Sequence, residues 1–372
     1  MPHEILHLDD PTAPQPAELP LLAETLATGR LSGGAPIIER YEKALAEQFG
    51  VPYALAVSSG SAALHAALAT VGARDGKKVL VPAVAPLPSI LPILAARAVP
   101  VFVDTKPDRL EFDAIDLQRC LENETGIRAL LTVSLWGYPF DVRPVRDILQ
   151  DHTIATIEDA SHAHGSLLAG RQIGSDADLA CFSTHDCKTL STGEGGFVLC
   201  HDPDLYQRIE SYCRLGHLSG HVFGVNYKLG ALGAALGLAR LPTLHDTITQ
   251  RNTNAAALLG ALPETSPLHE LSSPPDATPN HYALVLYTPN EKGPRFAAAL
   301  AAQDILTDRT RYGYHVSYTH DLFRSYQRSC PNAWHFVENT HQLPVDPHLG
   351  ETLPHLHTST LAAISRTYGA SS

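Results

Sequence analysis

Cysteine is scarce in this chain, and no two cysteines form a closely spaced pair. Six cysteines among 372 residues are too few for a disulfide framework. Without a Cys-x-x-Cys pair, a structural zinc site is not expected either. The six are Cys120, Cys181, Cys187, Cys200, Cys213 and Cys330. The composition therefore predicts reduced thiols in a reducing compartment and no bound metal.

Basic residues and long apolar runs are lacking as well. The 27 Lys and Arg residues are outnumbered by 39 Asp and Glu residues, which gives a formal net charge of −12. An acidic surface repels phosphate backbones, so we expect small-molecule substrates and no nucleic-acid partner. The most membrane-like stretch, residues 87–103, contains three prolines and Arg97, so it is interpreted as a helix and a buried strand. The first twenty residues are acidic and proline-rich, unlike a signal peptide, which favours a soluble cytoplasmic protein.

Short apolar segments alternate with amphipathic ones over the first 200 residues. Strands are predicted at 53–57, 78–81, 99–103, 129–133, 155–157, 179–182 and 196–200. Helices are predicted between them, at 36–50, at 86–96, at 115–122, at 142–150 and directly after residues 58–61. This alternation predicts an α/β fold with a mostly parallel, seven-stranded sheet covered by helices on both faces. The last two strands are separated only by a loop, which favours an antiparallel pair.

The two ends of the chain show different patterns. Residues 1–30 are expected to form an arm that ends in a helix, with Leu19, Leu22 and Leu26 on one face. A long helix is predicted from 229 to 258, kinked near Pro242. Further on, the pattern indicates a boundary loop at 266–279, a strand at 282–287 and a helix at 294–303. We expect a large domain at 1–245 and a smaller α+β domain at 246–372.

Three polar segments follow predicted strands, where ligands bind in open α/β sheets. The first, SSGSAA at 58–63, opens a helix and suits an anion, although a plain helix cap explains it equally simply. The second, IEDASHAHG at 157–165, places Asp159 at a strand end, where a buried carboxylate needs a cationic partner. Its alternative is a capping Asp beside surface histidines. The third, CFSTHDCKTLSTGEGG at 181–196, contains Lys188, which is either a nucleophile or an ordinary solvated lysine.

One ligand would satisfy all three segments. It must offer a phosphate to the helix start, a cationic ring nitrogen to Asp159 and a carbonyl to Lys188. Pyridoxal 5′-phosphate (PLP) has these three groups. The convergence of the segments is more specific than any of them alone, so PLP is the predicted cofactor.

The same segments resemble a known family. SSGSAALHAAL, VPAVAP, IEDASHAHG and FSTHDCKTLSTGEGGFV are similar to motifs of the DegT-type sugar aminotransferases, which are fold-type I PLP-dependent enzymes. The similarity continues through GVNYKLGALGAALGLARL and CPNAWHFVENTHQLPVDPHLGE, over nearly the whole chain. It implies the fold-type I architecture, with a large PLP-binding domain and a smaller C-terminal domain.

The resemblance also implies residue roles. Lys188 would bind PLP as a Schiff base and serve as the catalytic base and acid, while Asp159 would pair with the pyridine nitrogen. His162 would lie against the 3-oxygen of PLP, and Pro86 stands where the family usually places an aromatic residue over the ring. The remaining implied contacts are Gly60, Ser61 and Ser183 with the phosphate, Asn226 with the phosphate of the neighbouring subunit in a homodimer with shared active sites, and His185, Tyr312, Tyr314 and His315 with the substrate.

The function implied is transfer of an amino group, from Glu or Gln, to a keto-sugar, a keto-cyclitol or a related small polar ketone. Specialised metabolism, such as antibiotic biosynthesis, is the expected setting. The family's N-x-R-M-x-E motif reads NYKLGA at 226–231, so another PLP reaction (decarboxylation, elimination or C–C bond formation) stays open. A non-catalytic PLP-binding regulatory protein is a further alternative. The i, i+4 pair His217 and His221 is flanked by glycines, which argues against a helical metal site.

Overall fold

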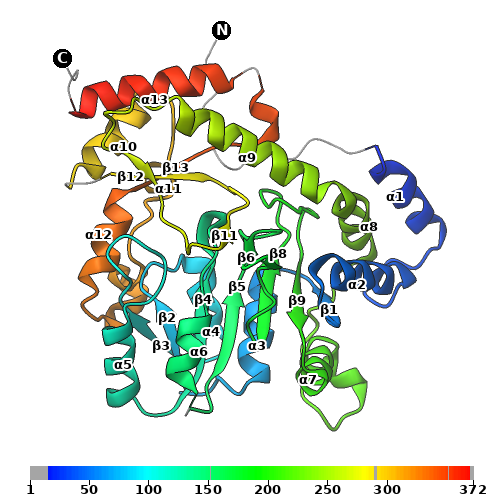
Figure 1. Ribbon diagram of the computed structural model, residues 1–372. Coiled ribbons are helices and arrows are strands. Elements are labelled where there is room, and N and C mark those ends of the chain that lie inside the picture. The colour runs from blue at the N-terminus through cyan, green and yellow to red at the C-terminus, as the bar shows by residue number, and fades with distance from the viewer. Residues whose placement is uncertain (1–15, 151, 289–290, 351, 369–372) are drawn as a thin grey trace.

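The computed structural model describes residues 16–150, 152–288, 291–350 and 352–368. Its main sheet has seven strands in the order β1-β9-β8-β5-β4-β2-β3, of which β2, β3, β4, β5 and β8 are parallel and β9 is antiparallel to both its neighbours (Figure 1). The bounds are β1 Tyr53–Val57, β2 Lys78–Pro82, β3 Val99–Val103, β4 Ile127–Val133, β5 Ala155–Asp159, β8 Leu179–Ser183 and β9 Gly196–Cys200. The predicted sheet and its antiparallel member are therefore confirmed.

Side chains alternate between two apolar clusters along the strands near β1. In β1, Leu55 and Val57 join one cluster, whereas Ala54 and Ala56 join the other. Since successive strand residues point to opposite faces, both faces of this part of the sheet are buried. The helices α3 (Gly60–Thr70) and α4 (Leu87–Ala95) belong to the first cluster, and α2 (Pro36–Phe49) and α8 (Ala231–Arg240) to the second.

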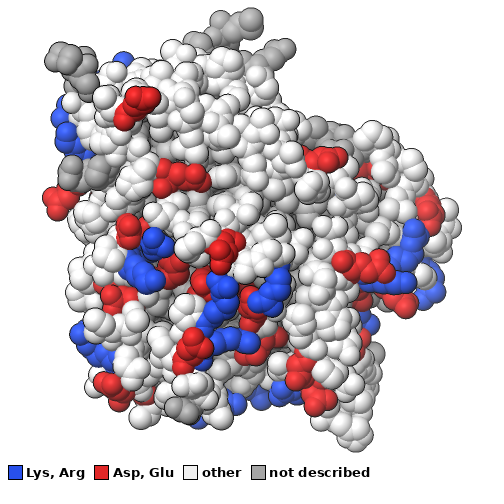
Figure 2. All heavy atoms as spheres, viewed as in Figure 1, with Lys and Arg blue, Asp and Glu red and all other residues white. Residues whose placement is uncertain are grey.

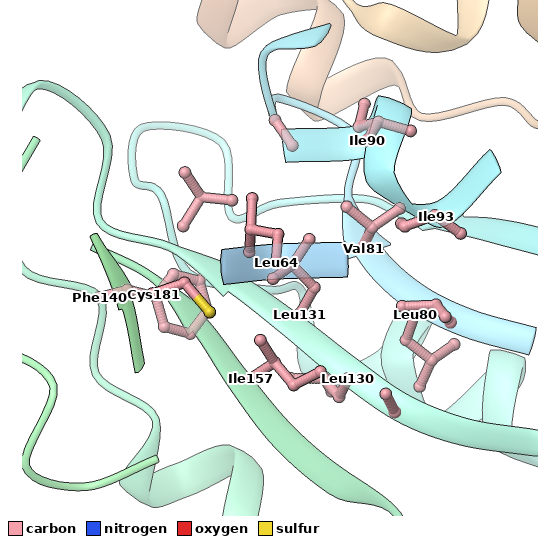
Figure 3. Close-up of a cluster of buried hydrophobic side chains, with 14 of the residues drawn as sticks. Leu64, Leu80, Val81, Ile90, Ile93, Leu130, Leu131, Phe140, Ile157 and Cys181 are labelled. Atoms are coloured by element: carbon pink, nitrogen blue, oxygen red, sulfur yellow. The ribbon is translucent and has the colours of Figure 1, made fainter. Parts of the chain in front are cut away.

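Figure 3 shows the first cluster at close range. Leu64 of α3 lies among side chains of the central strands, and Ile90 and Ile93 of α4 lie over β2. The labelled residues on and near the strands are Leu80, Val81, Leu130, Leu131, Phe140, Ile157 and Cys181. Runs of consecutive apolar residues in β2 and β4 are what a doubly covered parallel sheet requires.

The other helices follow the predicted pattern with small shifts. Those of the first half are α1 Glu18–Ala27, α5 Ala114–Asn123, α6 Arg143–Leu149 and α7 Pro203–Cys213. The predicted kinked helix is interrupted by a 3-10 turn at Leu241–Thr243, which contains Pro242, and continues as α9, Leu244–Gly260. Proline lacks the N–H that an unbroken helix needs, which explains the break.

The C-terminal part contributes strands to two small sheets, one of them shared with residues 167–172, and contains four more helices. One sheet has the order β10-β12-β13 (His269–Glu270, Leu284–Tyr287, Thr340–Leu343) and the other β11-β6-β7 (Ala277–Thr278, Leu167–Leu168, Arg171–Gln172). The helices are α10 Gly293–Ala301, α11 Asp308–Tyr312, α12 Pro331–Asn339 and α13 Leu353–Tyr368. In Figure 1, α13 lies beside α10 above β12 and β13, and these elements share a third apolar cluster. The predicted loop 266–279 thus contains two short strands, and a division at residue 245 stays a prediction.

The arm helix differs from its prediction. Leu19 and Leu26 of α1 are 78% and 54% exposed, whereas Glu18 and Thr25 are buried. Glu18 accepts a 2.7 Å hydrogen bond from Arg240 of α8. The buried side of α1 thus carries this ion pair. Leu19, Leu22 and Leu26 do follow helical spacing, but Leu19 and Leu26 are exposed within a single chain. Residues 1–15 of the predicted arm lie outside the described residues.

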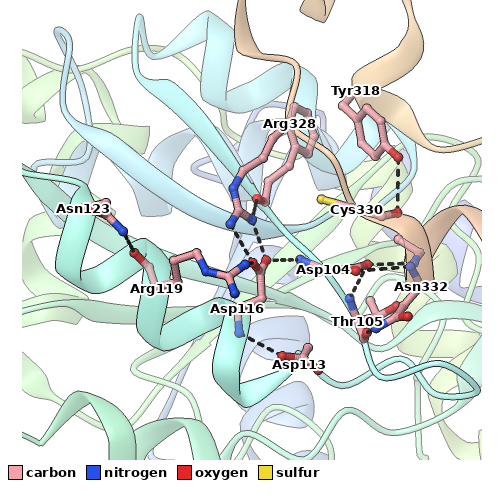
Figure 4. A network of polar contacts seen from close by, with 12 residues as sticks. Asp104, Thr105, Asp113, Asp116, Arg119, Asn123, Tyr318, Arg328, Cys330 and Asn332 are labelled. Carbon is pink, nitrogen blue, oxygen red and sulfur yellow. Dashed lines mark hydrogen bonds and ion pairs between the residues drawn. The ribbon is translucent and has the colours of Figure 1, made fainter.

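A polar network fastens the C-terminal part to the main sheet (Figure 4). Arg328 donates two hydrogen bonds to the carboxylate of Asp116 in α5. Asp104, just after β3, accepts from the backbone N–H groups of Asn332 and Ala333 at 3.1 and 2.7 Å. These contacts hold α12 and the segment before it against the end of β3.

Surface charge, helix apolarity and the state of the cysteines were also predicted from the sequence. On the face shown in Figure 2, Lys and Arg side chains are interspersed with Asp and Glu rather than gathered in one patch. Among the described residues, no helix combines the length and apolarity that crossing a bilayer demands. All six cysteines are free thiols, and Cys187 alone among them is not buried.

Candidate active site

A cavity of about 540 Å³ opens at the carboxyl ends of the parallel strands. Its floor comes from the ends of β5 and β8 and the first turn of α3, and its opposite wall from residues 308–320. The predicted site residues that line it are Gly60, Ser61, Pro86, Asp159, His162, Ser183, His185, Lys188, Tyr312, Tyr314 and His315. Residues more than 250 positions apart in sequence thus meet at the sheet edge that the strand-end rule indicates.

The anion-binding end is the start of α3. Ser59 caps the helix, with its Oγ accepting from the N–H of Ala62 at 3.0 Å. The N–H groups of the first turn have no acceptor inside the helix, so they and the helix dipole favour an anion there. A Cβ built on Gly60 would stand 2.7 Å from Cβ of Ser183. Glycine therefore lets α3 approach the end of β8 closely.

Asp159 is the last residue of β5 and is only 5% exposed. Its Oδ2 accepts the hydroxyl hydrogen of Ser89 at 2.6 Å, and its Oδ1 accepts the N–H of Ser161 at 3.1 Å. In the described part of the chain no Lys or Arg forms an ion pair with it. A buried carboxylate on a cavity wall without a cation suits a cationic ligand group.

His162 is oriented by its neighbours. Its Nδ1 accepts the backbone N–H of Trp136 at 3.1 Å, so the neutral ring carries its proton on Nε2. Its ring stacks on Tyr282, with centroids 4.2 Å apart, and Nζ of Lys188 lies 5.0 Å from the centroid of the same Tyr282 ring. Burial, and then the charge of Lys188, lower the pKa of His162 well below its usual value. A neutral His162 can donate from Nε2 while Nδ1 is occupied.

The expectation of surface histidines in this segment is wrong for His164. That side chain is fully buried against the stacked rings of Phe182 and Phe197. Burial and the charge of Lys188 lower its pKa to about 3. His164 therefore belongs to the apolar packing beneath the cavity rather than to its lining.

Lys188 lies in the loop between β8 and β9, in a turn closed by its own N–H donating to the carbonyl of His185 at 2.8 Å. Thr184 and Thr192 connect the two sides of this loop through a 2.6 Å hydrogen bond between their hydroxyls. A Cβ on Gly195 would lie 2.5 Å from Oγ1 of Thr184, so the glycines after the loop allow it to close tightly. The loop thus presents Lys188 to the cavity from a fixed support.

The opposite wall combines aromatic, imidazole and carboxylate groups. Tyr314 donates its hydroxyl hydrogen to the carbonyl of Val84, and its ring packs edge-on against Trp136. Burial raises the pKa of Tyr314, so its hydroxyl stays protonated and acts as a strut. His315 and His320 lie with ring centroids 4.0 Å apart. Asp308 accepts the indole N–H of Trp136 at 2.8 Å.

Several residues that line or support the cavity were not predicted from the sequence, among them Ser89, Trp136, Tyr282, Asp308 and His320. Trp136 lies three residues after the end of β4 and adopts a left-handed backbone with φ of 56°, so the strand-end rule extended a few residues past Val133 would have found it. Ser89 is a lone hydroxyl between apolar residues of α4. Tyr282 and Asp308 carry no local signal.

Asn226 does not line the cavity of its own chain. It is exposed, and its segment forms a short bridge with Arg214. His217 and His221 lie in the same irregular segment, and no group of three or more metal-binding side chains is found within the described ranges.

Comparison with known proteins places the chain in a family. Residues 14–353 match the model of the DegT/DnrJ/EryC1/StrS aminotransferase family. The chain belongs to this family, and the predicted resemblance is confirmed.

Individual relatives show how far the similarity reaches. GDP-perosamine synthase of Escherichia coli O157:H7 is 33% identical over 234 residues, which is 61% of this chain and 64% of that protein. L-glutamine:2-deoxy-scyllo-inosose aminotransferase of Streptomyces fradiae is 32% identical over 277 residues, 68% of this chain and 65% of that protein. The chain thus matches just under two thirds of the length of each. A crystal structure of a sugar aminotransferase from Micromonospora echinospora superposes with a TM-score of 0.85 at 26% identity, covering 95% of this chain and 98% of that one.

Proposed function

We propose that the chain is a PLP-dependent aminotransferase that moves an amino group from an amino acid to a keto-sugar, a keto-cyclitol or a related small polar ketone. The single observation that carries this proposal is one cavity lined by Lys188, by the buried Asp159 and by the first turn of α3. In the reaction, the donor exchanges its amino group for the ketone oxygen and becomes a 2-oxo acid. The donor loses the hydrogen on its Cα, and the former ketone carbon of the acceptor gains a hydrogen.

Three features of the cavity fit the cofactor. The first turn of α3, with Gly60, Ser61 and Ser183, offers N–H and hydroxyl groups to the phosphate. Asp159 offers to the protonated ring nitrogen a buried carboxylate that forms no ion pair with Lys or Arg in the described ranges. Lys188 offers a primary amine to the aldehyde. When bound, PLP supplies a conjugated ring that accepts the electron pair released at the donor Cα.

The side chains of this protein then handle protons and orientation. Lys188 would hold the aldehyde of PLP, and its amine, when free, would take the proton from the donor Cα and give one back at C4′. Ser89 holds the carboxylate of Asp159 in place, and that carboxylate would keep the ring nitrogen protonated. Trp136 holds His162 through Nδ1, so Nε2–H of His162 would be the group offered to the 3-oxygen.

The substrate is proposed to enter between the ring face covered by Pro86 and the wall at 312–315. His185, Tyr312 and His315 line this region with groups that can bind hydroxyls. Tyr314 contributes its ring, because its hydroxyl is committed to Val84.

We infer that the active unit is a homodimer. Leu218, Val222 and Phe223 are 81%, 55% and 72% exposed and lie close in sequence to Asn226. Exposed apolar groups of this kind favour a protein interface. A second copy placed there would bring Asn226 to the phosphate end of its partner's cavity.

Glutamine or glutamate is the proposed donor, in line with the name of the Streptomyces fradiae relative. A role in specialised metabolism, such as antibiotic biosynthesis, is proposed on the same ground. The free cysteines support work in a reducing cytoplasm.

The proposal is tested by the absorbance spectrum of the purified protein reconstituted with PLP. We expect a visible band that disappears on addition of L-glutamine or L-glutamate, with release of the matching 2-oxo acid. Lys188→Ala should lose the band and all turnover while keeping the circular dichroism of the wild type, and Lys77→Ala, a substitution outside the cavity, should change neither. Release of CO₂ or ammonia without a 2-oxo acid would indicate another PLP reaction. A bound cofactor without exchange of the donor Cα proton would indicate a non-catalytic binder.

A further inference from the structure

The charged groups around the cavity are unusual for a site that must bind a phosphorylated acceptor. Of the residues that line it, Lys188 alone is Lys or Arg, and that amine is engaged in the proposed chemistry. Arg311 lies nearby with its guanidinium over the ring of Tyr312, at 5.0 Å, but is not part of the lining. Arg309, on the same helix, is paired with Glu338. Neither arginine of this wall is therefore among the residues that line the cavity.

The residues that the structure does not describe cannot supply one either. By sequence, positions 1–15, 151, 289–290, 351 and 369–372 contain no Lys or Arg, so all 27 basic residues lie in the described ranges. Close to Asn226, the segment proposed to enter the partner's site, Arg214 is paired with Glu42 and Glu210. Lys228 is the other basic residue of that segment.

Apart from Lys188, the Lys, Arg, Asp and Glu side chains that line the cavity are all carboxylates. Asp308 and Glu194 both line the cavity, and Asp308 is held by the indole of Trp136. His320 is packed against His315, and burial, followed by the proximity of His315, lowers the pKa of His320. A neutral imidazole such as that of His320 binds hydroxyls as donor and acceptor rather than phosphates as a cation.

We propose that the amino acceptor is a polyhydroxylated ketone that carries no nucleoside diphosphate, and that Asp308, His315 and His320 recognise its hydroxyls. This rests on the proposed function. A diphosphate is normally bound by Arg or Lys, often in bidentate fashion, and an acidic wall would repel it. Carboxylate and neutral imidazole groups are suited to the hydroxyls of a free sugar or cyclitol, and Asp308 also tolerates an amino substituent on that ring.

The experiment separates the two half-reactions. The holoenzyme is first converted to its aminated form with L-glutamine, which tests the proposed function without any acceptor. The aminated enzyme is then mixed with 2-deoxy-scyllo-inosose or with a dTDP-linked 4-keto-6-deoxyhexose, and return of the visible absorbance is followed. We expect the neutral cyclitol to react faster by roughly tenfold or more. Equal or faster reaction of the nucleotide sugar overturns the inference, and failure of the first step overturns the proposed function instead.

A binding measurement decides the case in which neither ketone reacts. Millimolar dTDP should leave the Tm and the absorbance of the holoenzyme unchanged, and a shift in either at lower concentration overturns the inference. If dTDP binds and Lys228→Ala abolishes that binding, the partner subunit supplies the missing cation, and the inference also fails.

A gain-of-binding variant completes the design. His320→Arg places a cation at the open end and should create measurable dTDP binding, detected as a rise in Tm. His201→Arg, which adds the same charge at an exposed position outside the cavity, should not. If His320→Arg gains no binding while the wild type binds dTDP, the wall does not decide acceptor class and the inference is wrong.

Discussion

The hydroxyl of Ser89 donates a 2.6 Å hydrogen bond to Oδ2 of Asp159 and so joins the first turn of α4 to the end of β5. Ser89 is itself 1% exposed, so water cannot replace it. With the N–H of Ser161 on Oδ1, both carboxylate oxygens have a protein donor. The carboxylate is therefore held in one orientation before any ligand arrives.

We predict that Ser89→Ala weakens PLP binding and slows turnover without abolishing either. A hydrogen bond to a charged group contributes roughly 1.5–3 kcal/mol, so the Kd for PLP should rise about tenfold or more. Equilibrium titration of the apoenzyme with PLP measures this change. Ser161→Ala keeps its backbone N–H and serves as the control. A wild-type Kd in Ser89→Ala would mean that the bond does not position Asp159.

Gly60→Ala is expected to damage the phosphate end of the cavity. Its Cβ would lie 2.7 Å from Cβ of Ser183, so either α3 or the end of β8 must move. Overpacking of this kind costs about 1–3 kcal/mol in stability, and the displaced N–H groups should bind phosphate less well. Urea unfolding and PLP titration measure the two effects. At Gly260 an added Cβ meets nothing within 4 Å, so Gly260→Ala should leave both unchanged.

The sheet could be predicted because its strands are apolar on both faces and separated by helical periodicity. The same rule located Gly60, Asp159 and Lys188, since each lies at or just after the end of a strand or in the adjoining loop. These residues share one cavity, although their roles there stay a prediction. Local pattern and topology were enough for this half of the site.

The other half depends on long-range packing that no local pattern encodes. Tyr282 reaches His162 from 120 positions away, and Asp308 reaches Trp136 from 172 positions away. The exposure of Leu19 and Leu26 on α1 could not be predicted for a related reason, because the ion pair between Glu18 and Arg240 lies on the buried side of the helix. Hydrophobic periodicity cannot reveal a partner that lies over 200 residues further along the chain.

Subunit sharing can be tested with two inactive variants. If Asn226 acts on the partner's cavity, a heterodimer of Asn226→Ala and Lys188→Ala chains holds one site with both substitutions and one site with neither. We expect that heterodimer to regain one wild-type site, measured as visible absorbance and turnover at half the wild-type level per dimer. If Asn226 acts within its own chain, every site is defective and no activity returns. Mixing Lys188→Ala with itself provides the background.

The bidentate contact of Arg328 with Asp116 should make stability depend on pH in the acid range. Burial pushes the pKa of Asp116 upward, but the hydrogen bonds from Arg328 and from the N–H of Asp104 outweigh it, so the pKa lies below its usual value. The unfolded chain then takes up this proton first, near pH 3.9. The stabilisation is therefore complete above that pH and is lost as the pH falls through the lower folded-state pKa.

We accordingly predict that Arg328→Met lowers the free energy of unfolding at pH 7 by about 2 kcal/mol, because it removes two charged hydrogen bonds from Asp116 and leaves the exposed Arg119 as its cationic partner. Denaturant unfolding between pH 7 and pH 3 should show the difference from wild type shrinking below about pH 4, where Asp116 becomes protonated in the variant. Arg324→Met removes an ion pair with Asp321 whose partners are 74% and 90% exposed, so it should change stability by under about 0.5 kcal/mol. An equal loss in the two variants, or a difference that persists unchanged at low pH, would show that packing of the Arg328 side chain, rather than its charge, holds the C-terminal part to the sheet.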